Sequence, residues 1–414
     1  MVHLYCMLTI HEPVHGSADF ARLAEFMPRW RQVPLYCDAL RAGDFFRLPV
    51  IGKNELRQDF PRNFLPAGEN LETLLENRAV EMEHSSGTSE DRTAVLFDPG
   101  WWDRQEARVL RLNSLVSGVL TEYPAARRVT IVPPVCNGLV CFSNYNSRAE
   151  RTVGRTVYAN QARIPFLTTE AELARMARET ADWSPQFLDV DPVQGAWFAL
   201  YCERNKLRFP SLKFILASYE FVSVVHRRIL ERVFGVPVFN LYGSTETGHL
   251  LMENTRGEMK ACPEAVFYEV LAPDAQGVGD LVVSTLTNDI MPLLRYRVGD
   301  LVERRGRSPG ANWRVHGRAR DALSRPDGRR VTTWEADQCF AGVNGITHYQ
   351  LRQTADGSLG LQWIPDGAGP APVDLIGVRS RLEALLESRS PISVAQVTLL
   401  PPTPSGKFRL TCRA

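Results

Sequence analysis

The stretch VPVFNLYGSTETG, residues 236–248, points to the fold class of the chain. Residues 236–242 form an apolar run with β-branched and aromatic side chains, which is typical of a buried strand. Tyr242, Gly243 and Ser244 then lead into a polar loop at the carboxyl end of that strand. Layered α/β proteins bind ligands at such loops, so the stretch predicts both a sheet and a binding site.

The residue types in this loop suit a nucleotide. Tyr242 can cover a purine ring, Thr245 can bond a phosphate oxygen, and Glu246 can hold the Mg²⁺ that accompanies ATP. A tight turn that starts a helix, with Ser244 or Thr245 as the N-cap and Glu246 near the positive end, explains the same residues without a ligand. The loop alone leaves both interpretations open.

The surrounding sequence alternates predicted strands and helices. Further apolar runs at 129–135, 212–218 and 280–286 predict buried strands. One helix is expected to start at Thr169, where Glu172 follows at capping-box spacing, and another covers 222–234 with its apolar residues on one face. This alternation predicts an α/β fold, with a large layered N-terminal domain of mixed sheets and helices over residues 1–320.

A smaller α+β unit is expected over residues 321–414. It follows the Gly- and Arg-rich stretch that ends near Gly317, and contains a predicted helix at 378–388 and a predicted strand at 392–401. A segment of this length suits a compact module and is too short for an independent enzyme. We expect a mobile lid.

Composition excludes several classes of function. The 414 residues include 48 Lys and Arg against 47 Asp and Glu, so no strong field attracts nucleic acid or an anionic membrane. No apolar run approaches the roughly 18 residues of a membrane span, and a cytoplasmic protein is expected. The eight cysteines form no CxxC pair, so reduced thiols are expected and no structural zinc.

Two further segments have residues that suit phosphate and ribose. The first holds adjacent hydroxyl and glycine residues that can surround phosphate oxygens: Ser85, Ser86, Gly87, Thr88 and Ser89. The second, LLRYRVGDL at 293–301, brings Asp300 to a strand-to-turn junction, where a carboxylate suits ribose hydroxyls. A Ser/Thr-rich turn and an Asp after Gly are also routine turn chemistry.

The last two segments lie near the predicted boundary and near the C-terminus. GRARD at 317–321 contains Arg318 and Asp321, and PTPSGKF places Lys407 after a glycine in a polar loop. Read in order, SSGTS, YGSTE, RYRVGD, GRARD and PTPSGK resemble the motif series of the adenylate-forming superfamily of acyl-CoA synthetases, luciferases and adenylation domains. The short length and the segment FRLPVIGKNELRQDFP resemble the phenylacetate-coenzyme A ligase branch.

The resemblance implies a role for each motif. Lys407, Thr245 and Glu246 would be catalytic, with Lys407 as the lid lysine, Thr245 at the α-phosphate and Glu246 on Mg²⁺. Asp321 would lie at the hinge of the lid. The remaining nucleotide-binding residues would be Ser85, Ser86, Gly87, Thr88, Ser89, Glu220, Tyr242, Gly243, Ser244, Asp300 and Arg318.

The implied reaction uses ATP and Mg²⁺ to convert a carboxylic acid to an acyl-adenylate, followed by thioester formation with coenzyme A. An alternative acceptor is the phosphopantetheine of an acyl carrier protein. A second alternative is a nucleotide-binding homologue with impaired catalysis, because Glu90 and Asp91 place two carboxylates beside the expected triphosphate. The resemblance is also compatible with a homodimer.

The acid pocket is the least determined part of the site. Its expected wall combines residues after the phosphate segment with the ASYE segment at 217–220, and comprises Asn137, Phe142, Tyr145, Ser218 and Tyr219. Aromatic and small side chains of this kind suit an aryl or arylalkanoic acid. Ordinary core or surface residues explain the same positions equally well.

Overall fold

The computed structural model describes residues 17–41, 45–85, 92–134, 146–306, 310–367 and 373–413. The helices are α1 (Ser17–Trp30), α2 (Cys37–Arg41), α3 (Lys53–Arg57), α4 (Leu71–Glu76), α5 (Trp101–Leu110), α6 (Ser114–Glu122), α7 (Glu170–Trp183), α8 (Pro192–Arg204), α9 (Val224–Phe234), α10 (Thr333–Gln338) and α11 (Leu375–Leu386), with 3₁₀ turns η1 (Phe45–Arg47), η3 (Pro165–Leu167) and η4 (Ala319–Asp321). The strands are β1 (Glu81–His84), β2 (Ala94–Phe97), β3 (Arg128–Ile131), β4 (Thr152–Val153), β5 (Thr156–Tyr158), β6 (Phe187–Val190), β7 (Phe214–Ala217), β8 (Val238–Ser244), β9 (Gly248–Glu253), β10 (Met259–Ala261), β11 (Val266–Leu271), β12 (Val278–Thr285), β13 (Tyr296–Arg305), β14 (Asn312–Arg318), β15 (Leu323–Ser324), β16 (Arg330–Val331), β17 (Ile346–Gln353), β18 (Leu359–Pro365), β19 (Ser393–Gln396) and β20 (Thr411–Arg413).

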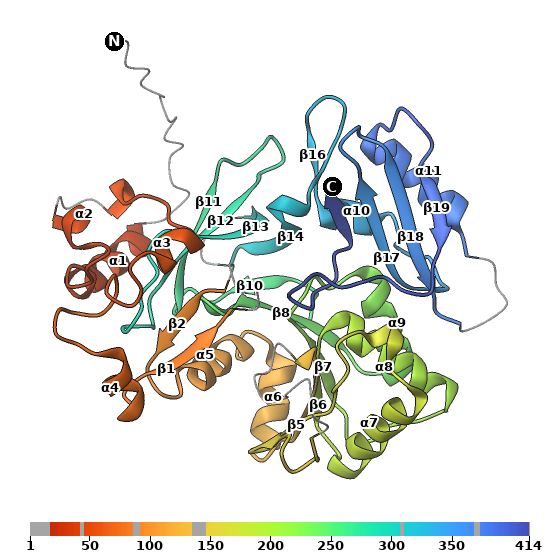
Figure 1. Cartoon of the computed structure of the whole chain (residues 1–414), viewed down its shortest axis with the longest axis horizontal. Helices are drawn as coiled ribbons and strands as arrows, with labels where there is room; N and C mark the ends of the chain where they lie inside the picture. Colours follow the sequence, from red (N-terminus) through yellow and green to blue (C-terminus); the bar gives the residue numbers. More distant parts are fainter. Residues whose placement is uncertain are drawn as a thin grey trace.

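A large mixed sheet forms the centre of the molecule (Figure 1). Within the described residues it has twelve strands, in the order β11-β12-β13-β14-β10-β9-β8-β7-β6-β3-β5-β4. Strands β8, β7, β6, β3 and β5 are parallel to one another, and the edge strand β4 is antiparallel to β5. Strand β8 is also antiparallel to β9, so it joins the parallel half to the antiparallel half. The α/β fold class predicted from the sequence is confirmed.

Strand β7 shows why the central strands have continuous apolar runs. Phe214 and Leu216 belong to the apolar core on the side of α5 and α6, whereas Ile215 and Ala217 belong to the core on the side of α7, α8 and α9. Successive side chains of a strand point to opposite faces, so a strand covered on both faces is apolar at every position. The helices on each face therefore pack their apolar residues against this sheet.

The main elements predicted from the sequence are confirmed, with shifted ends. Thr169 is the N-cap of α7 and accepts a hydrogen bond from the backbone N–H of Glu172 at 3.2 Å. Helix α9 begins two residues later than the predicted range, because Ser223 accepts a hydrogen bond from the Val225 N–H and caps it there. The predicted C-terminal helix corresponds to α11 and starts earlier, at Leu375.

Residues 321–413, as far as described, are called the C-terminal unit below. A four-stranded sheet in the order β19-β18-β17-β20 forms its centre, flanked by α10 and α11. Strand β17 contacts α8 and α9, and one apolar cluster contains both Ile229 of α9 and Ile346 and Leu351 of β17. The C-terminal unit is therefore docked on the large sheet's helices through a continuous apolar core.

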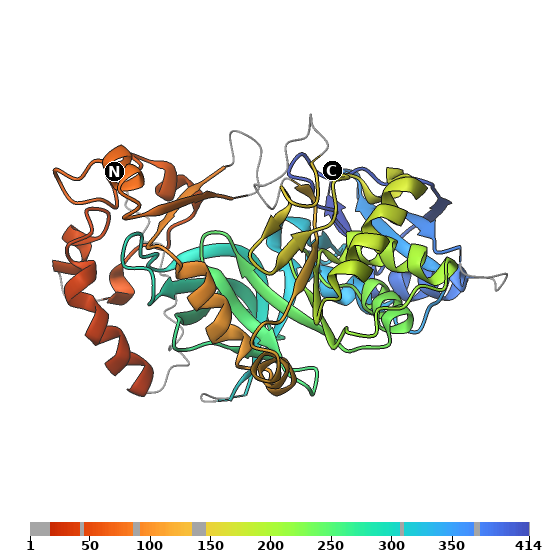
Figure 2. The same cartoon turned by 90° about the horizontal axis from the view of Figure 1, so that it is seen from below.

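The three N-terminal helices lie far from the contact between the C-terminal unit and the large sheet's helices. Figure 2 shows α1, α2 and α3 at the end of the molecule opposite the C-terminal unit. No helix in the described part of the chain combines the length and the apolar character needed to cross a bilayer.

Candidate active site

The stretch at 242–248 forms a hairpin between β8 and β9. Tyr242, Gly243 and Ser244 are the last residues of β8, and β9 begins at Gly248, so residues 245–247 form the turn. A Cβ atom on Gly243 would lie 2.3 Å from the Gly248 carbonyl oxygen, so only glycine permits this close backbone approach. The alternative of a helix that starts here is wrong, and Thr245 and Glu246 project from a tight turn at the carboxyl end of β8.

Asp300 lies within β13, and the predicted strand-to-turn junction is wrong. Gly299 has a φ of +91°, and the pairing of β13 shifts register against β12 across residues 298–300 and against β14 between Leu301 and Val302. A left-handed glycine and a bulge redirect the strand without ending it, which the sequence pattern does not distinguish from a turn. Asp300 is therefore held by its pairing with Arg318 of β14, within a bulge of β13 against β12.

Three of the predicted nucleotide-binding residues meet at Asp300. Its Oδ2 accepts a hydrogen bond from the Tyr242 hydroxyl at 2.7 Å, and its Oδ1 is 3.2 Å from Arg318 Nε. Burial, and then the Asp300 carboxylate, raise the pKa of Tyr242 well above its ordinary value, and Asp300 also raises the pKa of Arg318. The phenol stays a donor and the guanidinium stays charged, so they hold a fixed carboxylate suited to accepting hydroxyl donors.

Glu246 forms an ion pair with a lysine that the sequence analysis missed. Lys53 Nζ, at the start of α3, is 2.8 Å from Glu246 Oε1 and 3.4 Å from Ser85 Oγ. Burial acts to raise the pKa of Glu246, but the Lys53 ammonium outweighs it and the net pKa is below its ordinary value. Lys53 was part of the quoted N-terminal segment, but only the tertiary structure brings it to the hairpin.

The predicted phosphate segment is described only at Ser85, and Ser86, Gly87, Thr88 and Ser89 lie outside the described residues. Ser85 Oγ accepts a hydrogen bond from the Thr93 N–H at 3.0 Å, which fixes the start of the segment. A hollow of about 500 Å³ flanks it, lined by Leu56, Arg57, Phe60, His84, Arg92 and Ala94. Its basic side chains favour anionic groups beside the segment.

Lys407 lies half-buried in the loop before β20, and its ammonium opposes the burial that raises the pKa of both Asp191 and Glu220. The backbone N–H of its neighbour Phe408 donates to Glu220 Oε1 at 2.7 Å. Burial and Asp191 raise the pKa of Glu220 well above its ordinary value, and the Lys407 ammonium opposes them. Glu220 follows β7 and Asp191 follows β6, so the lysine lies at the carboxyl ends of parallel strands.

Asp191 is a second residue that the sequence analysis missed. Its Oδ1 accepts hydrogen bonds from the N–H groups of Val193 and Gln194, both at 3.0 Å, and caps α8. Its Oδ2 is buried without a hydrogen-bond partner among the described residues. Burial raises the pKa of Asp191 to about 6, against the effect of the capping N–H groups and of Lys407. An Asp-Pro pair after a buried strand was the available signal, but it indicates only a helix start.

The predicted hinge residue contacts the same loop as the lysine. Asp321 lies in η4, and its Oδ1 pairs with the guanidinium of Arg409, two residues after Lys407. Arg163 of the large sheet's side also donates to the Pro404 carbonyl at 2.5 Å. The lysine loop is thus held at both ends. The hinge role of Asp321 stays a prediction.

Ser218 and Tyr219, predicted for the acid pocket, both contact Asp189 of β6. The Ser218 hydroxyl donates to Oδ1 at 3.0 Å and the Tyr219 hydroxyl to Oδ2 at 3.2 Å. Arg128 lies 3.6 Å from the same carboxylate and makes two 3.0 Å hydrogen bonds with Glu106. Tyr219 has a φ of +71°, which is unfavourable for a bulky residue. This wall of the site is polar and charged.

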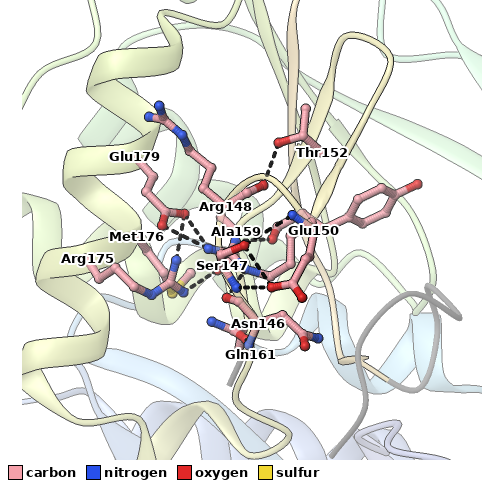
Figure 3. A network of polar contacts seen from close by, with 12 residues as sticks. Asn146, Ser147, Arg148, Glu150, Thr152, Ala159, Gln161, Arg175, Met176 and Glu179 are labelled. Atoms are coloured by element: carbon pink, nitrogen blue, oxygen red, sulfur yellow. Dashed lines mark hydrogen bonds and ion pairs between the residues drawn. The ribbon is translucent and has the colours of Figure 1, made fainter. Parts of the chain in front are cut away.

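The other predicted pocket residues, Asn137, Phe142 and Tyr145, lie outside the described residues. The chain that follows them is anchored by a polar network on α7 (Figure 3). Fully buried Arg151 donates to the Asn146 carbonyl at 3.1 Å and to both carboxylate oxygens of Glu179 at 2.8 and 2.9 Å. Glu179 also pairs with Arg175 at 2.6 Å. The network fixes where this segment returns to the sheet.

Replacement of Arg151 by Met is expected to lower the free energy of unfolding by about 3 kcal/mol, because removal of one partner leaves a buried carboxylate poorly compensated. Arg175 still pairs with the Glu179 carboxylate in this variant, so the expected loss of stability is at the lower end of the range for broken buried ion pairs. Urea unfolding measures it. Arg148→Met is the matched control: Arg148 is 45% exposed and 3.5 Å from Asp182, so a change of about 0.5 kcal/mol or less is expected. Equal losses in both variants would contradict the assignment.

A second hollow, of about 580 Å³, lies at the other ends of the parallel strands. Its lining includes Arg127 and Gln186, the residues just before β3 and β6, together with Tyr123, Arg155 and Trp183. Asp191 follows the opposite end of β6, and Glu220 follows the same end of the neighbouring strand β7. Ligands of open α/β sheets bind at the carboxyl ends, so this hollow does not belong to the candidate site.

Comparison with known proteins gives a distant relative by sequence. No protein-family model matches the chain. Protein CapK of Staphylococcus aureus is 22% identical over 263 residues, which covers 62% of this chain and 53% of that protein. The chain thus matches only about half the length of this curated relative.

Comparison with solved structures shows the fold. A 2-hydroxyisobutyryl-CoA ligase in the postadenylation state is 16% identical with a TM-score of 0.66, and the match covers 93% of this chain and 87% of that one. An anthranilate CoA ligase bound to anthranoyl-AMP is 14% identical (TM-score 0.57, 79% and 64% covered). ATP-bound MatB from Rhodopseudomonas palustris is 15% identical (TM-score 0.51, 79% and 66% covered). The chain has the fold of these adenylate-forming ligases, and the phenylacetate branch stays a prediction.

The same 2-hydroxyisobutyryl-CoA ligase has a TM-score of 0.66 in the postadenylation state and 0.54 in the thioesterification state.

Proposed function

We propose that this chain is an AMP-forming acid–thiol ligase that activates a carboxylic acid with ATP and transfers the acyl group to coenzyme A. The observation that carries the proposal is the position of Lys407. It reaches from the C-terminal unit to the carboxyl ends of β6 and β7, where Glu220 accepts the neighbouring N–H. The fold shared with acyl-CoA ligases supports the same reaction class.

The first step makes an acid anhydride. A carboxylate oxygen of the substrate attacks the α-phosphorus of ATP, the bond to the β-phosphate bridging oxygen breaks, and pyrophosphate leaves with the electron pair. Negative charge grows on the α-phosphate oxygens in the transition state. The Lys407 ammonium stabilises that charge and aligns the carboxylate, and the Thr245 hydroxyl on the hairpin turn bonds the α-phosphate.

The nucleotide lies between two sets of residues, Asp300 with Tyr242 and Arg318 at the ribose and adenine, and Glu246 at the phosphates. Asp300 accepts the ribose hydroxyls, while Tyr242 lies against the adenine and Arg318 keeps the carboxylate in place. Glu246 is an ionised carboxylate that already takes a cation, Lys53, which fits a magnesium ligand. Bound there, Mg²⁺ would neutralise charge on the departing phosphates. Ser85 would bond those phosphates, whereas Ser86, Gly87, Thr88 and Ser89 lie outside the described residues.

The second step transfers the acyl group. A thiolate sulfur attacks the acyl carbon, the bond from that carbon to the phosphate oxygen breaks, and AMP leaves. A lysine that served the first step has to leave before a thiol reaches the same carbon, so the proposal includes a movement of the C-terminal unit with Asp321 as the pivot. The solved states of the 2-hydroxyisobutyryl-CoA ligase support such a movement for this fold.

For the acid we propose an aryl or arylalkanoic acid with a polar ring substituent. Tyr219 supplies an aromatic ring beside Glu220, and its hydroxyl belongs to the polar wall with Asp189 and Arg128. Most of these groups hydrogen-bond one another, but Arg128 Nε is buried without a hydrogen-bond partner among the described residues, so an acceptor on the ring would be favoured.

Acid-dependent exchange of labelled pyrophosphate into ATP tests the proposal. The panel contains benzoate, phenylacetate, their hydroxylated and aminated forms, and aliphatic acids of matched size. Exchange with at least one aromatic acid is expected, and substituted acids should exceed the parent compounds. If none of the acids supports exchange above the acid-free control, a catalytically impaired nucleotide-binding protein replaces the proposal.

The acceptor is tested separately, with the best acid from the panel. Coenzyme A is offered beside a carrier protein that bears phosphopantetheine, and the thioester product is measured. Faster transfer to coenzyme A is expected. Transfer only to the carrier protein would keep the adenylation step and replace the second half of the proposal.

A further inference from the structure

Two buried histidines join the C-terminal unit to the large sheet's helices. His226 lies on α9 and His348 on β17, and each is 1% exposed. Their ring nitrogens Nε2 and Nδ1 are 3.1 Å apart, and the rings stack with centroids 5.3 Å apart and 14° between planes. A single hydrogen bond at this distance needs one donor and one acceptor, so the pair is formed by two neutral imidazoles.

The pair has no other polar support in the described residues. His226 Nδ1 and His348 Nε2 are buried and lack hydrogen-bond partners among them. Burial lowers the pKa of His226 to about 3, and burial together with His226 lowers the pKa of His348 well below its ordinary value. A proton added to either ring would be a charge without a counterion, close to a second imidazole.

The pair also lies directly behind the lysine loop. The His348 ring is 5.5 Å from the Phe408 ring and 5.7 Å from the Phe166 ring of η3. Phe408 follows Lys407 in sequence and donates its N–H to Glu220. A change in how His348 packs on α9 therefore acts on the group that places Lys407.

We propose that the His226–His348 pair is a proton-sensitive contact that positions Lys407 by keeping the C-terminal unit docked during adenylation. The inference rests on the proposed function, because it assigns the docked arrangement to the adenylation step. The two histidines are positioning residues and touch no reacting group. They belong to different units, so any movement that frees Lys407 from the site separates them.

The sign of the pH effect follows from proton binding. Once separated, both imidazoles meet water and regain the ordinary histidine pKa of about 6.5. The undocked arrangement then binds more protons below that pH, so the histidine contribution to docking is complete above about pH 7 and is lost as the pH falls. For each histidine the docking equilibrium weakens by up to about tenfold per pH unit below 6.5.

Buried acids near the contact act in the opposite direction. Asp337 of α10 accepts hydrogen bonds from Ser223 and Tyr349, and burial raises its pKa to about 6. Asp191 and Glu220 beside Lys407 also have raised pKa values, whereas burial and then Arg232 lower the pKa of the nearby Arg228. These acids favour docking as the pH falls. The contribution of the two histidines is therefore obtained by comparing the pH dependence of docking in the wild type with that in a variant whose residues at 226 and 348 do not titrate.

The double variant His226→Gln/His348→Gln is the matched control, because two amides can share a hydrogen bond and do not titrate. Amide hydrogen exchange of the α9 and β17 peptides is compared at the same pH for both proteins, which cancels the intrinsic pH dependence. From pH 7 to pH 5.5, the protection of the wild type is expected to fall at least about tenfold relative to the variant. Parallel pH profiles would overturn the proposal.

A second measurement does not depend on the variant folding. Carbon NMR of the histidine Cε1 positions in the wild type, with signals identified by single substitutions, reports the pKa of each ring. Both rings of the docked pair are expected to stay neutral well below pH 6.5, so their Cε1 signals should not shift as the pH falls to that range. Ordinary titration of both rings near pH 6.5 overturns the proposal.

Activity then separates positioning from general stability. In His348→Ala, pyrophosphate exchange at pH 7.5 is expected to fall about tenfold, while thioester formation from supplied acyl-adenylate stays near the wild-type rate. The double variant His226→Gln/His348→Gln should restore the rate of pyrophosphate exchange. Equal loss of both steps overturns the positioning role. Amide hydrogen exchange and NMR need no substrate, so they test the histidine pair by itself. If the proposed function is wrong, only the pyrophosphate exchange of the wild type fails.

Discussion

Lys407→Ala is expected to slow acid-dependent pyrophosphate exchange by about 10²–10³-fold, the loss typical of removing one group that stabilises transition-state charge. The ammonium is the cation that the C-terminal unit brings to the carboxyl ends of β6 and β7, beside Glu220 and Asp191. Thioester formation from supplied acyl-adenylate should continue near the wild-type rate, because the α-phosphate bond has then already been broken. Measuring the two half-reactions in the same preparation gives this ratio directly.

Lys206→Ala is the control for the loss of a lysine, because Lys206 is exposed after α8 and away from the lysine loop. It should leave both half-reactions unchanged. Removal of the Lys407 ammonium also removes a group that lowers the pKa of Glu220 and Asp191, so both values should rise further in the variant. A loss of equal size in both half-reactions would show that Lys407 supports folding or thioester formation as much as adenylation.

Patterns that are local in sequence predicted the fold well. The apolar runs of β3, β7, β8 and β12 are short and bounded, and Thr169 with Glu172 marks the start of α7. A strand buried on both faces and a capped helix leave signals within a few residues of sequence. The polar, glycine-containing sequence around Lys407 likewise predicted a loop, whereas its catalytic role came from the resemblance of the ordered motifs and stays a prediction.

Features that depend on contacts between distant segments were mispredicted or missed. Gly299 and Asp300 were expected at a turn because Gly-Asp is frequent there, but the pairing of β13 with β12 and β14 continues the strand. Lys53 lies 193 positions before Glu246, and nothing in its own segment indicates that pairing. Asp191 was not identified because its signal is that of a helix cap, and only the docked loop adds Lys407 to its surroundings.

The pairing of Lys53 with Glu246 leads to the second large effect. Glu246→Gln is expected to lower pyrophosphate exchange by about 10²-fold at ordinary Mg²⁺ concentration, since a neutral amide is a much weaker ligand for a hard cation than a carboxylate. Part of the rate should return at higher Mg²⁺. The readout besides activity is the Mg²⁺ dependence of ATP binding, measured by calorimetry on the variant and on the wild type.

Lys53→Met is the variant that separates the two roles of Glu246. It breaks the same 2.8 Å ion pair but keeps the carboxylate. If Glu246 serves only to pair with Lys53, the two variants should lose similar stability and show the same Mg²⁺ dependence. If Glu246 is the metal ligand, Lys53→Met should need less Mg²⁺ than the wild type, because the ammonium and the metal compete for one carboxylate and its removal frees that group. An unchanged Mg²⁺ requirement in Glu246→Gln would place the metal elsewhere, and the hairpin turn would then contribute Thr245 alone to the reaction.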